Sequence, residues 1–230
     1  MKPGVETLAR VPLFSTLDTG VLKHLSAIGD LARFGPNDEI FPENAIPQEI
    51  VLLLSGIVAT THSEGRRERA VIDVVLPVTL IGCHAALLRQ PAPHGAHTIA
   101  SSRCLLFPAA EFALLAEESP HLFRRIFSAC LQETSALQKE LTTLKLHSAV
   151  ERLAFYLLDL AEGHAEIPAR FVLPFEKRFL AGKIGCSPVN LSRAFATLRA
   201  VGVETQREVV LLRDVAALRA FTFRTSRARA

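Results

Sequence analysis

A run of residues at strict heptad spacing is the feature that most constrains the fold of this chain. The positions step alternately by four and three and make three heptads, a period typical of a helix that pairs with another helix along a coiled-coil seam. Ser119 is a suitable N-cap for this helix, and Pro120 a suitable first residue. The seam residues are Phe123, Phe127, Cys130, Thr134, Leu137, Leu141 and Leu144.

Two interpretations of this helix are open. It either joins two copies of the chain along the seam, or lies as a single amphipathic helix against its own domain, and the charged residues off the seam suit both. We favour a dimerisation helix over residues 119–147.

The sequence before this helix has an extended pattern. Apolar and β-branched runs alternate with glycine, proline and the Glu64-Gly65 turn, which predicts a compact antiparallel β-roll or barrel over residues 1–118. A helix over Leu13 to Ile28 is expected to precede it. The expected strands are Ile50–Leu54, Ile57–Thr61, Ala70–Val75 and Leu80–Ile81.

The sequence after the long helix, residues 148–230, predicts a different domain. Ser148 and Glu151 form a capping box that opens a helix, which Gly163 ends. A strand in "RFVLP", a helix from Pro174 to Ile184 and a turn at Gly185 follow. A second helix then runs from Ser187 to Val201, and "VETQREVVLL" alternates as a hairpin. The whole chain is therefore predicted to be α+β, and this order of elements is that of a winged helix-turn-helix.

Charge and composition narrow the class of protein. Residues 1–147 hold 13 Lys and Arg against 15 Asp and Glu, whereas residues 148–230 hold 13 against 8, so the basic part is the C-terminal third. Such asymmetry favours a polyanionic partner. We expect a cytoplasmic protein without a membrane interaction, because neither a signal peptide nor an apolar run of spanning length is present. The four cysteines lie singly and predict neither disulfides nor a zinc site.

The helix-turn-helix predicts specific contacts with double-stranded DNA. The second helix would enter the major groove, with Leu191, Phe195 and Leu198 turned inward. Arg193 is best suited to guanine, because its guanidinium can donate to both O6 and N7. The predicted DNA-binding residues, of which Lys177, Ser187, Gln206 and Arg207 would meet phosphate, are Lys177, Ser187, Asn190, Ser192, Arg193, Thr197, Gln206 and Arg207.

Nearly the whole chain resembles the Crp/Fnr regulators, from "VPLFSTLDTGVLKHL" through "GPNDEIFPENAIPQEIVLLLSGIV" to "EKRFLAGKIGCSPVNLSRAFATLRAVGV". The resemblance implies a sensing jelly roll like those that bind cyclic nucleotides, and a long helix that makes a homodimer. It also implies a winged helix-turn-helix that binds a palindromic promoter site and recruits or blocks RNA polymerase. In the Fnr branch a Glu, a Ser and an Arg read the half-site. Ser192 and Arg193 match the last two, but Val189 occupies the Glu position, so the operator is expected to differ.

The resemblance does not by itself identify the ligand that the roll senses. In the cyclic-nucleotide branch a Gly-Glu and an Arg-Ser of the roll hold the ribose and phosphate. Here Cys83 or His84 stands near that Glu, and "HGA" replaces the Arg-Ser-Ala, so cAMP would lose its cationic partner and is not expected. An iron–sulfur cluster is not expected either, because no cysteine precedes Cys83, whereas the oxygen-sensing type has an N-terminal cysteine cluster.

Imidazole and thiol groups are instead frequent in the roll. His84 lies at or next to the position of the haem-ligating histidine of carbon-monoxide-sensing relatives, and the helix-turn-helix looks most like the nitric-oxide-responsive denitrification regulators. The resemblance therefore implies haem with His84 as an axial ligand and Cys83 as a second ligand. A different small-molecule effector and no ligand at all are the open alternatives.

Two other classes of protein are alternatives. Rolls of this kind resemble metal-binding cupin enzymes, but the strands show no HxH or two-His-one-carboxylate spacing, and "HGAH" with its glycine suits a loop. No catalytic or metal-binding residue is predicted. A module that binds a partner other than DNA is the second alternative.

Overall fold

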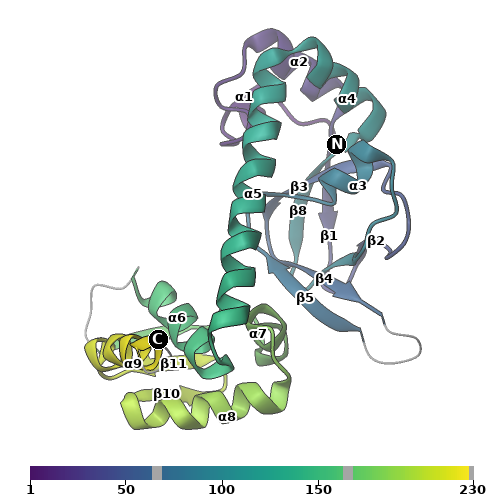
Figure 1. Cartoon of the computed structure of the whole chain (residues 1–230). Coiled ribbons are helices and arrows are strands. Elements are labelled where there is room, and N and C mark those ends of the chain that lie inside the picture. The colour runs from purple at the N-terminus through teal and green to yellow at the C-terminus, as the bar shows by residue number, and fades with distance from the viewer. Residues whose placement is uncertain (64–68, 163–167, 228–230) are drawn as a thin grey trace. The chain divides into compact units, whose positions relative to one another are not determined.

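The computed structural model describes residues 1–63, 69–162 and 168–227, with side chains described as far as Thr222. The chain divides into two compact units, Met1–Ala136 and Leu137–Ala230. The first holds a β-roll with helices, and the second holds a helical domain with a small sheet (Figure 1). The predicted order of helix, strand, helix, turn, helix and hairpin is confirmed in the second unit. The predicted Glu64-Gly65 turn and the helix end at Gly163 lie outside the described residues.

The roll consists of two four-stranded antiparallel sheets (Figure 1). One sheet has the order β1-β8-β3-β6, with strands Asp30–Phe34, Ser102–Pro108, Glu49–Ser55 and Thr79–Ile81. The other has the order β2-β7-β4-β5, with strands Glu39–Phe41, Gly95–Thr98, Val58–His62 and Ala70–Val75. The four strands expected from the sequence are β3, β4, β5 and β6, with ends that differ by a residue or less.

Strand β3 explains why the roll has two apolar cores. Successive side chains of a strand point to opposite faces, and β3 is apolar on both. Val51 and Leu53 face the space between the two sheets, whereas Ile50 and Leu52 face a layer of helices. That layer consists of α1 (Val5–Ala9), α2 (Thr19–Ile28), α4 (Ala109–Glu118) and the start of α5 (Pro120–Leu146).

The prediction of one helix from Leu13 to Ile28 is wrong. Two helices form, α1 and α2, and Asp18 begins the second by accepting a hydrogen bond from the Val21 N–H at 3.0 Å. Phe14 lies between them, fully buried against Phe107. The loop expected for "HGAH" is also wrong, because Gly95 to His97 belong to β7, where antiparallel pairing with β4 fixes an extended backbone.

The second unit contains a helix-turn-helix with a three-stranded sheet (Figure 1). Helix α6 (Ala149–Ala161) has the predicted capping box of Ser148 and Glu151. The sheet has the order β10-β11-β9, with strands Val203–Gln206, Val209–Leu212 and Ala169–Val172. Helix α7 is Lys177–Ile184, later in starting than predicted because Glu176 takes the N-cap position. Helix α8 is Pro188–Leu198, and α9 (Val215–Arg227) was not predicted.

Within the described ranges, no helix combines the length and the apolar character needed to cross a membrane.

Candidate nucleic-acid interface

The turn between α7 and α8 depends on a glycine. Gly185 has a φ of +70°, and a Cβ placed on it would lie 2.5 Å from Cδ2 of Leu144. Ser187 then caps α8, since its Oγ accepts a hydrogen bond from the Asn190 N–H at 3.2 Å, and Pro188 is the first helical residue. The predicted helix start is therefore confirmed.

Helix α8 has a buried face and an outer face. Leu191, Ala194, Phe195 and Leu198 are buried against the unit, as the spacing predicts. The outer face carries the remaining predicted residues of the helix, all exposed: Asn190, Ser192, Arg193 and Thr197, together with Val189.

Not every polar group on that face is available. Ser192 donates its hydroxyl to the Pro188 carbonyl at 3.0 Å, and Thr197 donates to the Arg193 carbonyl at 3.1 Å. By contrast, the side chains of Asn190 and Arg193 make no hydrogen bond or ion pair within the described part of the chain. Arg193 and Asn190 are therefore the polar side chains of this face whose donors are free among the described residues, whereas Ser192 and Thr197 keep only their acceptor positions.

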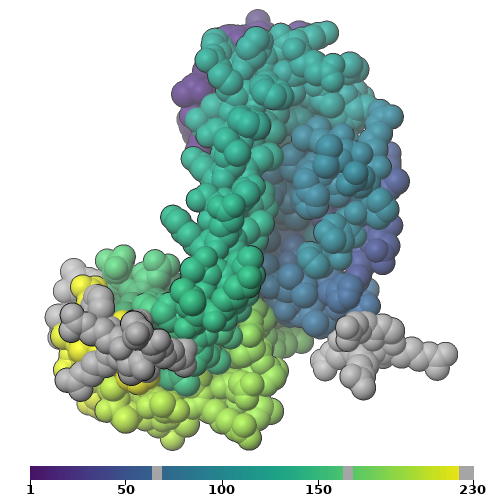
Figure 2. All heavy atoms as spheres, viewed as in Figure 1, coloured from purple at the N-terminus to yellow at the C-terminus, as the bar shows by residue number. Residues whose placement is uncertain are grey.

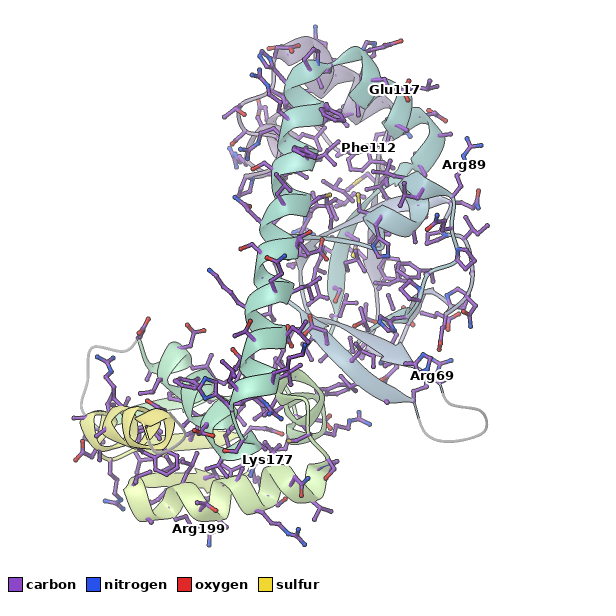
Figure 3. The ribbon with its side chains drawn as sticks, viewed as in Figure 1. Arg69, Arg89, Phe112, Glu117, Lys177 and Arg199 are labelled. Carbon is purple, nitrogen blue, oxygen red and sulfur yellow. The ribbon has the colours of Figure 1, made fainter. Side chains whose placement is uncertain are left out.

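Lys177 stands at the edge of this surface in a partly buried position. Its Nζ lies 5.1 Å from the centre of the Phe195 ring and 3.5 Å from Oγ1 of Thr205. It lines a cavity of about 280 Å³ together with Arg178, Ser192 and Arg199. Figure 3 shows Lys177 and Arg199 in this unit. The sequence reasoning missed Arg178, in the first turn of α7, and Arg199, which follows α8. Arg178 forms an ion pair with Glu176 at 3.1 Å.

The wing is the hairpin of β10 and β11. Gln206 and Arg207 are exposed at its tip, and Arg207 has a φ of +54°. Glu204 and Arg213 are paired across the strands at 2.5 Å, and this hydrogen bond lowers the pKa of the Glu204 carboxyl. Glu204 is therefore neutralised by Arg213, whereas Arg207 makes no ion pair within the described part of the chain.

Arg152 ties this domain together, and sequence reasoning missed it. From α6 its guanidinium donates to the carbonyls of His147, at 2.6 Å, Ile184, at 2.7 Å, and Gly185, at 3.0 Å. The first carbonyl follows α5 and the other two end α7, where a cation is favoured by the helix dipole. One side chain thus fixes both the end of α5 and the helix-turn-helix turn.

The seam residues of α5 are largely exposed in the single chain. The exposed fractions are 54% for Phe123 and Phe127, 56% for Leu137, 51% for Leu141 and 39% for Leu144. Figure 2 shows the side chains of α5 as a continuous ridge. Cys130 differs, because it packs partly against the core of the roll unit, and the Thr134 hydroxyl donates to its carbonyl at 2.9 Å.

The residues suggested for haem do not come together as a haem site. Cys83 and His84 begin α3 (Cys83–Leu88), after Gly82 at a φ of +65°. Cys83 is 4% exposed in the helix-packed core, and burial raises the pKa of its thiol to about 12, whereas His84 is exposed. A thiol of this kind is a poor ligand, since the thiolate is the form that binds iron.

The position beside Gly82 is filled by the side chain of Phe41, which belongs to the core between the two sheets. The ring of Phe41 packs on Gly82, so that a Cβ there would lie 2.6 Å from Cζ of Phe41. Neither Cys83 nor His84 lines the two cavities of the roll unit, of about 290 Å³ and 430 Å³. The residues present do not fit haem at this position, and haem binding stays a prediction without structural support. Among the described residues, no group of three His, Cys, Asp or Glu is arranged to hold a metal ion.

Two family models match the two units. The cyclic nucleotide-binding domain matches residues 31–119, and the Crp-like helix-turn-helix domain matches residues 151–221. The chain is 25% identical over 193 residues to the nitrogen fixation regulation protein FixK of Bradyrhizobium diazoefficiens, covering 82% of this chain and 79% of FixK. It is 22% identical over 172 residues to the transcriptional activator protein FnrL of Cereibacter sphaeroides, covering 70% and 68%.

Solved structures share the fold. FixK2 from Bradyrhizobium japonicum superposes with a TM-score of 0.69 at 19% identity, covering 84% of this chain and 96% of that one. A mutant of CooA from Carboxydothermus hydrogenoformans gives a TM-score of 0.69 at 16% identity, covering 88% and 90%. Roll, long helix and helix-turn-helix occur in one chain, both domains match, and the relatives are regulators by name. The chain therefore belongs to the Crp/Fnr family of transcriptional regulators.

Proposed function

We propose that this chain acts in the cytoplasm as a homodimer that binds a palindromic promoter site through α8 and controls transcription by contact with RNA polymerase. The observation that carries the proposal is the outer face of α8, where Arg193 and Asn190 are exposed and free. Guanine offers O6 and N7 to an arginine, and adenine offers N6 and N7 to an asparagine. Lys177, Arg199 and Arg207 supply cations for phosphates.

The exposed seam of α5 supports the dimer. Several large apolar side chains at heptad spacing are half-exposed on one helix. Their exposure to water is unfavourable unless a second helix covers them. A second copy of α5 has the matching spacing by definition. A parallel pair would then place two α8 helices on successive major grooves, so the half-sites would lie about one turn, roughly 34 Å, apart.

Selection from random duplex DNA tests this function. The full-length protein should enrich a palindrome, and sedimentation should show one dimer on each enriched duplex. Failure to bind any DNA at low salt would contradict the proposal, because the non-specific electrostatic contribution alone should be measurable there.

We further propose that the signal is a small molecule held beside α5. The roll unit has a cavity of about 430 Å³ lined by Leu52 and Leu80 from the sheet and by Ser128, Ala129 and Gln132 from α5. Arg125, which also lines it, already donates to the carbonyls of Pro12 and Leu13, so its charge is partly engaged. This size and mixed lining suit a small organic effector.

Two measurements separate the candidate signals. A visible spectrum of protein from haem-replete cells that lacks a Soret band would exclude haem, and a saturating Soret band would exclude the present proposal. Native mass spectrometry should show a bound small molecule that the cavity-filling variant Ala129→Phe releases. Retention of the same mass by the variant would place the ligand elsewhere.

A further inference from the structure

Val189 occupies an unusual position for an apolar side chain. It is the second residue of α8, and 60% of it is exposed, while the residues that hold α8 in place are on the opposite face. A β-branched residue also has a lower helix propensity than most polar residues. Packing of the domain therefore gives no reason for valine at this point of the helix.

The neighbours of Val189 show what kind of surface it belongs to. Asn190 follows it directly, and Arg193 lies four residues on, where side chains share a face of a helix. Both are exposed with free polar groups, whereas Ser192 has donated its hydroxyl to the backbone. The first two turns of α8 thus present one apolar group, one amide and one guanidinium.

The first turn of such a helix is the part that meets base edges in the major groove. The groove offers a single apolar group, the 5-methyl of thymine, and apolar side chains contact it there. Valine cannot accept the N4 hydrogen bond of cytosine, so a G·C pair opposite Val189 would lose the hydration of that amino group without compensation.

We infer that Val189 is a specificity-determining residue that packs on the 5-methyl of one thymine in each half-site and so selects an A·T pair there. This assignment rests on the proposed function, because it requires α8 to lie in the major groove. It adds a base identity and a mechanism that the free polar groups of α8 do not supply.

Replacement of thymine by uracil tests the contact directly, because uracil pairs as thymine does and lacks only the methyl. Each thymine of the selected operator is replaced in both half-sites, and binding of the full-length dimer is measured. One thymine position should weaken binding about fourfold per half-site, the cost of removing one buried methyl. In Val189→Ser the same replacement should have no effect, since the contact is already lost.

Two further variants complete the design. Val189→Glu should shift the selected pair at that position from A·T to G·C, because a carboxylate accepts from cytosine N4. Leu114→Ser is the matched control, since it removes an apolar side chain that is 59% exposed on α4, and it should keep the uracil effect of the unchanged protein.

The outcomes separate this inference from the proposed function. If no operator is selected, the proposed function fails. If an operator is selected and uracil has the same effect on the unchanged protein and on Val189→Ser at every thymine, DNA binding stands and the role of Val189 is overturned.

Discussion

The DNA-binding unit and the roll unit differ in how far their reactive and polar side chains are exposed. In the DNA-binding unit, Arg193 and Asn190 stand exposed and free on α8. In the roll unit, Phe41 closes the space beside Gly82, and the Cys83 thiol is buried with a pKa raised to about 12. The outer face of α8 is therefore open to a partner, whereas the position beside Gly82 is part of the apolar core.

The packing beside Gly82 limits where a signalling ligand can bind in the roll unit. A ligand that shifts the equilibrium between two conformations must bind one of them more tightly than the other. A ligand beside Gly82 would have to displace Phe41, whereas the cavity beside α5 is already open. The effector is therefore expected to act on α5 from outside the space between the sheets.

Charges in the seam should have the largest effect. Leu137→Asp together with Leu141→Asp places four carboxylates in a dimer interface, which should prevent pairing. Affinity for the palindrome should fall by about 1,000-fold or more, towards non-specific binding. Sedimentation and titration of labelled operator measure both effects together. A double mutant that remains dimeric would show that the seam residues serve a different purpose.

Removal of the ring that closes the roll should be nearly as costly. Phe41 is 9% exposed, and Phe41→Ala should lower the free energy of unfolding of the roll unit by about 3–5 kcal/mol, as for other buried phenylalanines. Phe41→Leu, which refills most of the volume, is the control and should recover most of that loss in thermal unfolding. The selected operator sequence should not change in either variant. A stable Phe41→Ala would mean that the interior tolerates opening and could hold a ligand.

Alanine substitution of Arg193 on α8 and of His84 on α3 tests one exposed residue in each unit. Arg193→Ala should cost roughly 1–3 kcal/mol per half-site and relax preference at one base pair. His84→Ala, which removes an exposed side chain from α3, should leave operator affinity within about twofold, since surface changes of this kind are small. Both are measured by selection and titration in parallel. Unchanged base preference in the first variant would remove Arg193 from base readout.

The helix-turn-helix could be predicted because its determinants are local. The glycine turn, the Ser187 cap, Pro188 and the apolar spacing of α8 all lie within about twenty residues, so propensity and capping agree with the tertiary structure. Alternation likewise located β3, β4, β5 and β6.

The parts that were missed depend on residues far apart in the chain. Arg152 reaches carbonyls 32 and 33 residues away, and Phe41 meets Gly82 from another sheet. The predicted helix begins later than expected, at Thr19, because Phe14 lies in a turn and is buried against Phe107. Neither spacing nor propensity in a single sequence carries these contacts.

Gly185→Ala should have a smaller effect that is confined to the DNA-binding unit. The substitution places a Cβ at a φ of +70° and within 2.5 Å of Leu144, so it should destabilise that unit by more than about 1 kcal/mol. Gly4→Ala is the control, because a Cβ on Gly4 would meet its nearest atom at 3.8 Å and cause no crowding. Hydrogen exchange of α7 and α8 amides should increase in the first variant alone. Equal exchange in both would show that the turn tolerates a side chain.

Arg207 on the wing should give the smallest effect, seen in salt dependence instead of specificity. A phosphate contact releases condensed counterions, so each such contact adds about one to the slope of log affinity against log salt concentration. Arg207→Gln should therefore reduce the slope by about one for each half-site while the selected sequence stays the same. Glu208→Gln is the control, because it also removes one charge from an exposed neighbouring residue, but a negative one. It should not reduce the slope. A change in base preference without a change in slope would assign Arg207 to base readout, and would make the wing a second reading element beside α8.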